Sequence, residues 1–251
     1  MTKETCKNCG NSFDLSYCNA CGQKTAHRLN AGHILHEAIH VFTHADKSIL
    51  RFIPKLVLYP GIIALDYVNG KRKSQFNIFQ YLILVAGIVV FVFNKTNILE
   101  EGIKQLNDPN LSKRIVVVQG KIMHFLQSYF NIILLLLIPV FAFFSKLFFK
   151  KRGYNYAENV VLECSIQAQQ NTISLVTMIV LYLVGSPSIF QIVIIPMLIT
   201  VSTKALAYRQ FFKTSWIESI LKAILVYACV YAIQMITVMI VIIVLVVMGK
   251  K

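Results

Sequence analysis

The stretch that decides the fold is "AILVYACVYAIQMITVMIVIIVLVVMG", residues 223–249, which carries no charged side chain over its whole length. A helix needs about 20 apolar residues to cross a bilayer core of about 30 Å. A crossing segment must be helical, because in lipid the backbone has to satisfy its own hydrogen bonds. The stretch therefore predicts a transmembrane helix over 221–248.

Four further apolar blocks precede it, and each predicts a span of its own. They are "YLILVAGIVVFVF" (81–93), "IILLLLIPVFAFF" (132–144), "ISLVTMIVLYLVG" (173–185) and "IFQIVIIPMLITV" (189–201). With their flanks they predict spans over 76–94, 127–147, 166–185 and 188–206. The chain of 251 residues is 56% hydrophobic and 14% charged, which is too apolar for a soluble domain. We expect an all-α polytopic membrane protein with about five transmembrane helices, occupying 76–251.

The net charge of +14 fits a topology signal better than nucleic-acid binding. With the N-terminus in the cytoplasm, most of the Lys and Arg residues fall on the inner side of the predicted spans. They lie in the N-terminal region, in 146–153 and from Lys204 to Lys222. We therefore expect a multi-pass protein of the cytoplasmic (inner) membrane, with loop 95–126 outside and no nucleic-acid partner. Anionic lipid head groups are the expected partners of the basic run before the first span, Lys71, Arg72 and Lys73.

The N-terminal sequence "CKNCGNSFDLSYCNACGQK" (6–24) contains two C-x-x-C-G units. The two-residue gap lets both thiolates of a unit reach one tetrahedral ion, and the glycine permits a turn with positive φ. A reducing cytoplasm disfavours the alternative of two disulfides. The pattern predicts a zinc ribbon over 1–28, with one zinc per chain on Cys6, Cys9, Cys18 and Cys21. Four cysteines fill the coordination sphere, so this zinc is expected to be structural.

A second motif lies in "HILHEAIHVFTH" (33–44), which contains the H-E-x-x-H string of zinc peptidases. In that chemistry His36 and His40 bind zinc and Glu37 is the general base. No third ligand is recognisable downstream, and on a helix the histidines share one polar face. Three interpretations stay open: a plain polar face, which we favour, a peptidase site, and a non-catalytic metal or proton-responsive site. The last would use His33, His36, His40 and His44.

The region 29–75 is expected to hold cytoplasmic amphipathic helices. Its second part, "SILRFIPKLVLYPGIIALDYVNG" (48–70), is long enough to cross a membrane but is interrupted by charges and by Pro60-Gly61. Charges at the middle of a bilayer cost about 2.5–3.5 kcal/mol each. Two interfacial helices broken at Pro60-Gly61 therefore fit better, and a re-entrant arrangement stays open.

Polar residues near the third span define a candidate cavity. Its candidate lining consists of Glu158, Glu163, Gln167 and Gln170. Carboxylates near a span are rare and mark polar pathways, whereas amides more often form interhelical hydrogen bonds. No buried Asp/Arg relay or charged pathway is recognisable in the spans, which argues against an ion pump.

Several of these blocks, in this order, resemble an uncharacterised bacterial integral-membrane family that has an N-terminal four-Cys zinc ribbon followed by a membrane domain of unknown function. The resemblance is most specific at 36–48, at Pro60-Gly61 and at Gly70-Lys71-Arg72, and it continues in 154–161 and 206–223. In the family pattern a histidine is common after Glu158 and again a few residues on. This chain has Asn159 and then "CSIQAQQN" there, so that histidine pair is missing. The resemblance implies architecture and location, and no activity.

Three classes of function follow from the sequence. The favoured one is a non-enzymatic adaptor or scaffold that docks a partner protein through the zinc ribbon and the histidine-rich helix. The first alternative is a small transporter or lipid-handling protein, and the second is a membrane metallopeptidase using residues 36–40. The sequence identifies neither the partner nor the substrate.

Overall fold

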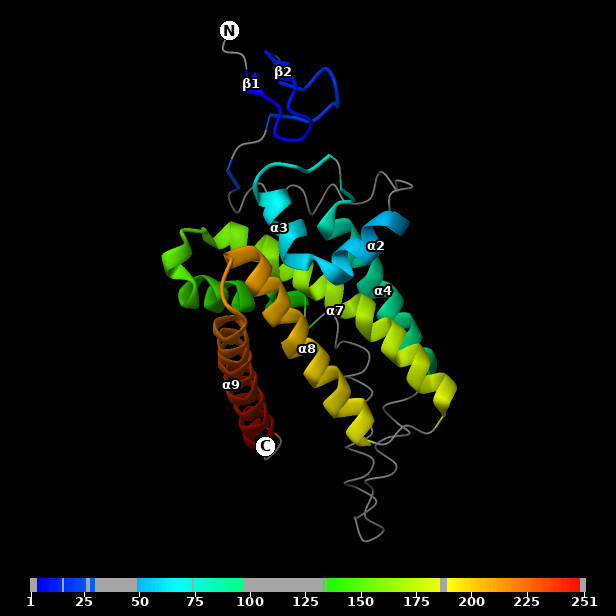
Figure 1. Ribbon diagram of the computed structural model, residues 1–251. Coiled ribbons are helices and arrows are strands. Elements are labelled where there is room, and N and C mark those ends of the chain that lie inside the picture. The colour runs from blue at the N-terminus through cyan, green and yellow to red at the C-terminus, as the bar shows by residue number, and fades with distance from the viewer. Residues whose placement is uncertain are drawn as a thin grey trace.

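The computed structural model describes residues 4–14, 16–25, 28–29, 49–73, 75–96, 133, 135–185 and 189–248. They form a small N-terminal hairpin unit above a bundle of helices (Figure 1). In the hairpin, β1 (Glu4–Thr5) pairs antiparallel with β2 (Ser12–Phe13). The helices are α2 (Ile49–Leu58), α3 (Pro60–Val68), α4 (Ile78–Thr96), an apolar helix Leu135–Phe148, the 3₁₀ turn η2 (Lys150–Arg152), α7 (Tyr156–Val184), α8 (Ile189–Phe212) and α9 (Trp216–Met248).

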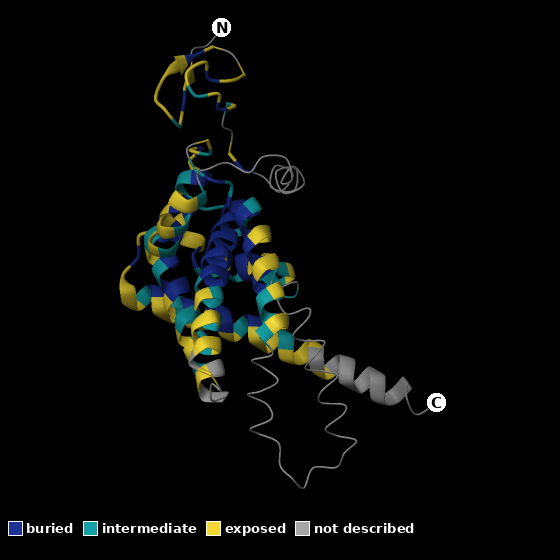
Figure 2. Ribbon diagram, turned by 90° about the vertical axis from the view of Figure 1, so that its right-hand side faces the viewer, coloured by how far each residue is buried: buried dark blue, intermediate teal, exposed yellow. Residues whose placement is uncertain are grey.

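Helix α7 is the centre of the bundle and contacts α2, α3, α4 and α8. It begins with a capping box, in which the Asn155 side chain accepts from the Glu158 amide while the Glu158 carboxylate accepts from the Asn155 amide. Its first half is buried and its second half is largely exposed, and Figure 2 shows the buried residues gathered in the part of the bundle nearer the hairpin unit. The sequence placed a span only from residue 166, whereas the helix begins ten residues earlier.

The helix break predicted at Pro60-Gly61 is confirmed, because α2 ends at Leu58 and α3 begins at Pro60. Proline suits the first turn of a helix, where its missing N–H has no intrahelical partner. Three carbonyls at the break accept from side chains of the long helices. Gln169 Nε2 donates to Val57 O at 2.7 Å, Gln210 Nε2 to Leu58 O at 2.9 Å, and Ser165 Oγ to Pro60 O at 2.8 Å.

Helix α3 is an integral part of the bundle, since it packs on both α7 and α8. Gly61 makes the closest approach. A Cβ at this position would lie 2.2 Å from Ala207 O and 2.9 Å from Phe211 N, so only glycine lets the two backbones meet. The Gly61 amide also donates to Gln210 Oε1 at 3.0 Å. The close contact between α3 and α8 therefore depends on glycine at position 61.

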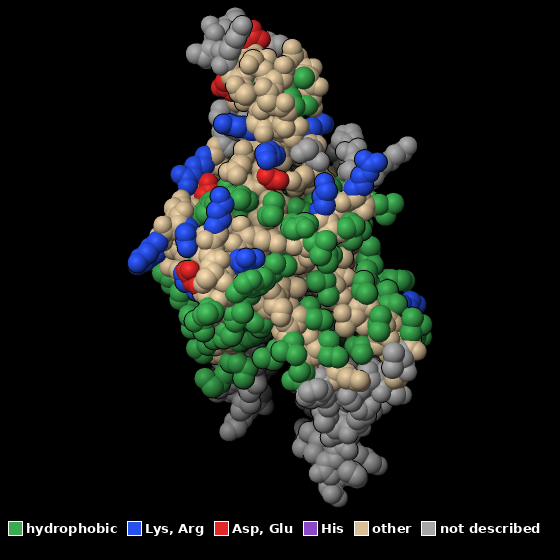
Figure 3. Space-filling model, in the orientation of Figure 1, with side chains coloured by type: hydrophobic (Ala, Val, Ile, Leu, Met, Phe, Trp, Pro, Cys, Tyr) green, Lys and Arg blue, Asp and Glu red, His purple; other side chains and the backbone are tan. Residues whose placement is uncertain are grey.

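Two helices in the described part of the chain are long and apolar enough to cross a membrane, namely Ile78–Thr96 and the segment Trp216–Thr237 of α9. Only 39% and 22% of their most apolar windows are buried, so much of their apolar surface faces outward. Figure 3 shows hydrophobic side chains covering the lower bundle and Lys and Arg side chains gathered above them. These features indicate membrane association.

The structure does not support all five predicted spans over the described residues. Of the predicted span 127–147, the structure describes an apolar helix over Leu135–Phe148, and this described part is shorter than a membrane crossing requires. The predicted spans 166–185 and 188–206 correspond largely to α7 and α8, and neither helix is among the two candidate spans found over the described residues. In α7 the buried amides Gln167, Gln169 and Gln170 lower the hydropathy of the predicted span.

Candidate functional site

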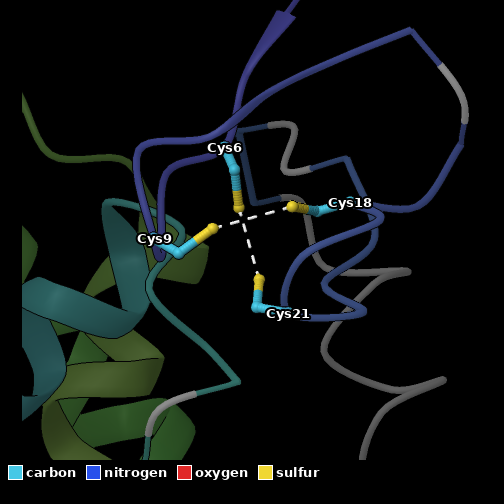
Figure 4. A group of neighbouring side chains, drawn as sticks. All are labelled: Cys6, Cys9, Cys18 and Cys21. Atoms are coloured by element: carbon cyan, nitrogen blue, oxygen red, sulfur yellow. Dashed lines mark hydrogen bonds between the residues drawn. The ribbon is translucent and has the colours of Figure 1, made fainter.

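The four N-terminal cysteines converge as the sequence predicted, and Figure 4 shows their sulfurs pointing toward one centre. All four Sγ atoms lie within 4.8 Å of one another. The Cys6–Cys21 and Cys9–Cys18 sulfurs are each 3.6 Å apart. A tetrahedral ion with metal–sulfur bonds near 2.3 Å has sulfur–sulfur edges of about 3.8 Å, so the group fits a metal ion closely. All six cysteines of the chain are free thiols, which excludes the disulfide alternative in this structure.

The backbone forms the same turn twice around this centre. In the first turn the Cys6 amide donates to Asn11 O and the Gly10 amide to Cys6 O, both at 2.9 Å. In the second turn the Cys18 amide donates to Gln23 O and the Gly22 amide to Cys18 O, both at 2.8 Å. Gly10 and Gly22 have φ of 78° and 70°, as predicted for the glycine after each pair.

The environment of Cys18 favours the thiolate that binds a metal. Burial raises its pKa, but the backbone amides of Cys21 and Ala20 and the thiols of Cys9 and Cys6 outweigh this and lower the pKa to about 6. The apolar core of the ribbon contains little besides Phe13 and the cysteines themselves. A bound ion is therefore needed to hold this small unit together.

Two side chains of the ribbon region attach it to the helical bundle. Gln23 Nε2 donates to Gly70 O at 2.5 Å, and Gln23 Oε1 accepts from the amides of Arg72 and Lys73 at 3.2 Å each. Farther on, Arg28 donates to both carboxylate oxygens of Glu158, at 2.8 and 3.2 Å. The basic run 71–73 is thus held through its backbone, and Lys71 pairs with Asp66 at 3.1 Å.

The histidine-rich segment lies outside the described residues. His33, His36, Glu37, His40 and His44 therefore have no structural account here, and the three interpretations of this segment stay predictions. The same holds for the loop 95–126 beyond Thr96.

The four residues of the predicted cavity are all buried in α7. Glu158 lines a cavity of about 470 Å³ between the ends of α3 and α7. Gln167 donates to Asn171 Oδ1 at 3.1 Å, and Gln170 Nε2 donates to Tyr227 OH at 2.9 Å and to Thr200 O at 3.1 Å. The two glutamines thus form the interhelical and intrahelical hydrogen bonds that are usual for buried amides.

Glu163 has partners that the sequence did not predict. Lys204 Nζ donates to its Oε2 at 2.5 Å, and Tyr208 OH donates to its Oε1 at 2.7 Å. The Lys204 and Glu163 side chains are only 2% and 3% exposed. The lysine ammonium also lies 4.2 Å from the ring centre of Phe141 and 4.9 Å from that of Tyr227, so it is enclosed by aromatic rings as well.

The sequence showed no charged pathway in the helical part, and it did not predict the buried Lys204–Glu163 pair. Lys204 had been counted with the inner-side charges because it lies near the end of a predicted span. One signal was present in the sequence: Lys204 and Tyr208 are separated by one helical turn, so they share a face of α8. The packing of that face on Glu163, 41 residues earlier in the chain, could not be read from spacing.

Comparison with known proteins adds no relative, since no family model, no curated protein and no solved structure matches the chain. The fold and the site define a mostly helical protein that has, in its described part, two helices long and apolar enough to cross a membrane, and an N-terminal group of four cysteines placed to hold a metal ion.

Proposed function

We propose that this protein is a non-enzymatic adaptor of the cytoplasmic membrane, whose zinc ribbon is held against the inner face of the bundle and docks a partner protein. The observation that carries the proposal is the double attachment of the ribbon by Gln23 and Arg28. A ribbon on a free tether would need no such contacts. Held in place, it presents the same exposed side chains, including Tyr17 at 56% exposure, in one orientation.

Zinc is the metal that four cysteine thiolates in tetrahedral arrangement favour. Metal analysis of the purified protein is expected to give one zinc per chain, and Cys9→Ser is expected to lose it. Cys229→Ser is the matched control, because Cys229 lies in α9 and is not one of the four converging cysteines. A zinc content that Cys9→Ser leaves unchanged would contradict the assignment.

The proposed topology is multi-pass, with the N-terminus inside. The concentration of Lys and Arg on the ribbon side of the bundle supports it, because positively charged residues stay in the cytoplasm. A reporter fused after Asn110 is expected to report the external side, and one fused before the ribbon the internal side. A cytoplasmic signal from both fusions would overturn the topology.

Photo-cross-linking in cells tests the docking role. A photoreactive residue replacing Tyr17 on the ribbon is expected to give a discrete protein adduct that disappears in the Cys9→Ser background. The control replaces Tyr59, an equally exposed tyrosine of the bundle. No adduct at Tyr17, or the same adduct at both tyrosines, would contradict the adaptor.

A second candidate function is a small transporter, and the buried Lys204–Glu163 pair favours it. Ionisable residues inside a membrane bundle are costly and often mark ion or proton pathways. With protein reconstituted into vesicles that contain a pH-sensitive dye, Glu163→Gln is expected to abolish proton exchange across the bilayer. Equal exchange in wild-type protein, Glu163→Gln and empty vesicles would remove this candidate.

A further inference from the structure

A cavity of about 470 Å³ lies beside Glu158, next to the Arg28 contact that attaches the ribbon. Its walls come from three distant parts of the chain: Arg28 after the ribbon, Asn69 and Gly70 at the end of α3, and Arg152, Tyr154 and Glu158 at the start of α7. A volume of this size is within the range of small-molecule sites and holds far more than one water molecule.

The residues that line the cavity carry a net positive charge. Two guanidinium groups face one carboxylate, and that carboxylate is already saturated. Glu158 accepts from Arg28 Nε at 2.8 Å, from Arg28 Nη2 at 3.2 Å and from the Asn155 amide at 2.7 Å. The cavity therefore offers an anion one largely uncompensated cation.

That cation is Arg152. Among the described residues, its nearest carboxylate oxygen is Glu218 Oε2 at 3.8 Å, which is beyond hydrogen-bond length. The other oxygen of Glu218 accepts from Lys222 at 2.6 Å, so one carboxylate is shared by two cations and compensates the Arg152 charge only in part. A planar guanidinium in this position can bind two oxygens of one phosphate, and the Asn69 side-chain amide and the Tyr154 hydroxyl are further potential donors in the lining.

The position of the cavity relative to the expected boundary between membrane and water indicates which class of ligand it binds. Arg209 stacks over Trp216 with its guanidinium carbon 4.6 Å from the ring centre, a pairing typical of the boundary between membrane and water. Arg152 and Glu218 connect the cavity lining to the start of α9, the same helix turn that carries Trp216. Below it lie the exposed apolar side chains Ile217 and Leu221.

We propose that this cavity binds a phosphate group, supplied either by the head group of an anionic phospholipid or by a free phosphate ester, with Arg152 as its main ligand. Phosphate oxygens are the acceptors that guanidinium groups match best, and basic pockets on the cytoplasmic side of membrane bundles recognise lipid head groups in this way. The site is separate from the four cysteines and from the Lys204–Glu163 pair.

Native mass spectrometry of the zinc-loaded protein can test the proposal. In one arm the protein is titrated with phosphatidylglycerol or phosphatidylcholine, and in the other with glycerol 3-phosphate or inorganic phosphate. Wild type is expected to bind one phosphate-bearing ligand saturably, and Arg152→Gln is expected to weaken this by about tenfold or more, as for loss of a charge-assisted hydrogen bond. Preference for phosphatidylglycerol identifies a lipid source, whereas binding in the soluble arm identifies a free ester.

The matched control is Lys146→Gln, which removes one exposed positive charge of the Leu135–Phe148 helix without touching the cavity lining. It is expected to bind like wild type. Equal weakening in both variants, unchanged binding in Arg152→Gln, or no saturable binding in either arm would overturn the proposal. Arg152→Gln leaves the four cysteines intact, so its zinc content and its Tyr17 adduct report the adaptor role independently.

Discussion

Helix α7 carries two buried carboxylates, Glu158 and Glu163, and each pairs with a cation, but the two cations differ in exposure. Glu158 pairs with Arg28, whose side chain is 65% exposed, whereas Glu163 pairs with Lys204, which is 2% exposed. Water and salt can reach and screen the first pair, but the second is sealed among aromatic rings. The Arg28–Glu158 pair therefore attaches the ribbon to the bundle, whereas the Lys204–Glu163 pair constrains how α7 and α8 pack.

The largest effect is expected from removing the lysine of the buried Lys204–Glu163 pair. Lys204→Met leaves Glu163 buried without its counter-ion, and loss of one partner of a buried pair costs about 3–5 kcal/mol of folding free energy. Thermal or denaturant unfolding in detergent measures this loss. Wild-type stability in the variant would mean that the two side chains do not meet in the folded protein.

Tyr208→Phe is expected to have the next largest effect. It removes the hydroxyl that donates to Glu163 at 2.7 Å and keeps the ring that packs in the bundle. A hydrogen bond to a charged group contributes about 1.5–3 kcal/mol. The control is Tyr182→Phe at the exposed end of α7, which is expected to be neutral; equal losses in the two variants would argue against a specific role for Tyr208.

Removing both charges together is expected to cost less than removing one. In Glu163→Gln combined with Lys204→Met no unpaired charge remains, and replacing a buried pair by neutral residues is often nearly neutral. A double-mutant cycle over the four proteins gives the coupling between the two side chains. Additive losses, with the double variant as unstable as the sum of the singles, would contradict a direct ion pair.

The smallest effect on the bundle is expected from Arg28→Gln. The free energy of unfolding of the bundle should change little, but the ribbon loses the contact of Arg28 with Glu158. Hydrogen exchange at the amides of Arg72 and Lys73, which donate to Gln23, should become faster, and raising the salt concentration should mimic this in the wild type. Lys151→Gln, on the exposed turn η2, is the control and should leave both amides protected.

The parts of the structure that sequence reasoning predicted are those that depend on neighbouring residues. The ribbon turns follow from C-x-x-C-G spacing, and the break between α2 and α3 follows from a proline that suits a helix start. The Lys204–Glu163 pair and the contact of Gly61 with Ala207 depend on which helix faces meet, and no local pattern encodes that. Two of the five predicted spans correspond to candidate membrane helices over the described residues, and in α7 the buried amides Gln167, Gln169 and Gln170 make the predicted span less apolar.

The three backbone carbonyls at the break between α2 and α3 that accept from the long helices have a consequence for biosynthesis. Val57, Leu58 and Pro60 receive their hydrogen-bond donors from Gln169, Gln210 and Ser165, which lie 112, 152 and 105 residues farther along the chain. At a synthesis rate of about 5–20 residues per second, those donors leave the ribosome roughly 5 to 30 seconds later. During that interval water or the insertion machinery must bind these carbonyls, because leaving them bare in lipid is too costly. The α2–α3 turn is therefore made early and reaches its final place only after the second half of the protein has been synthesised.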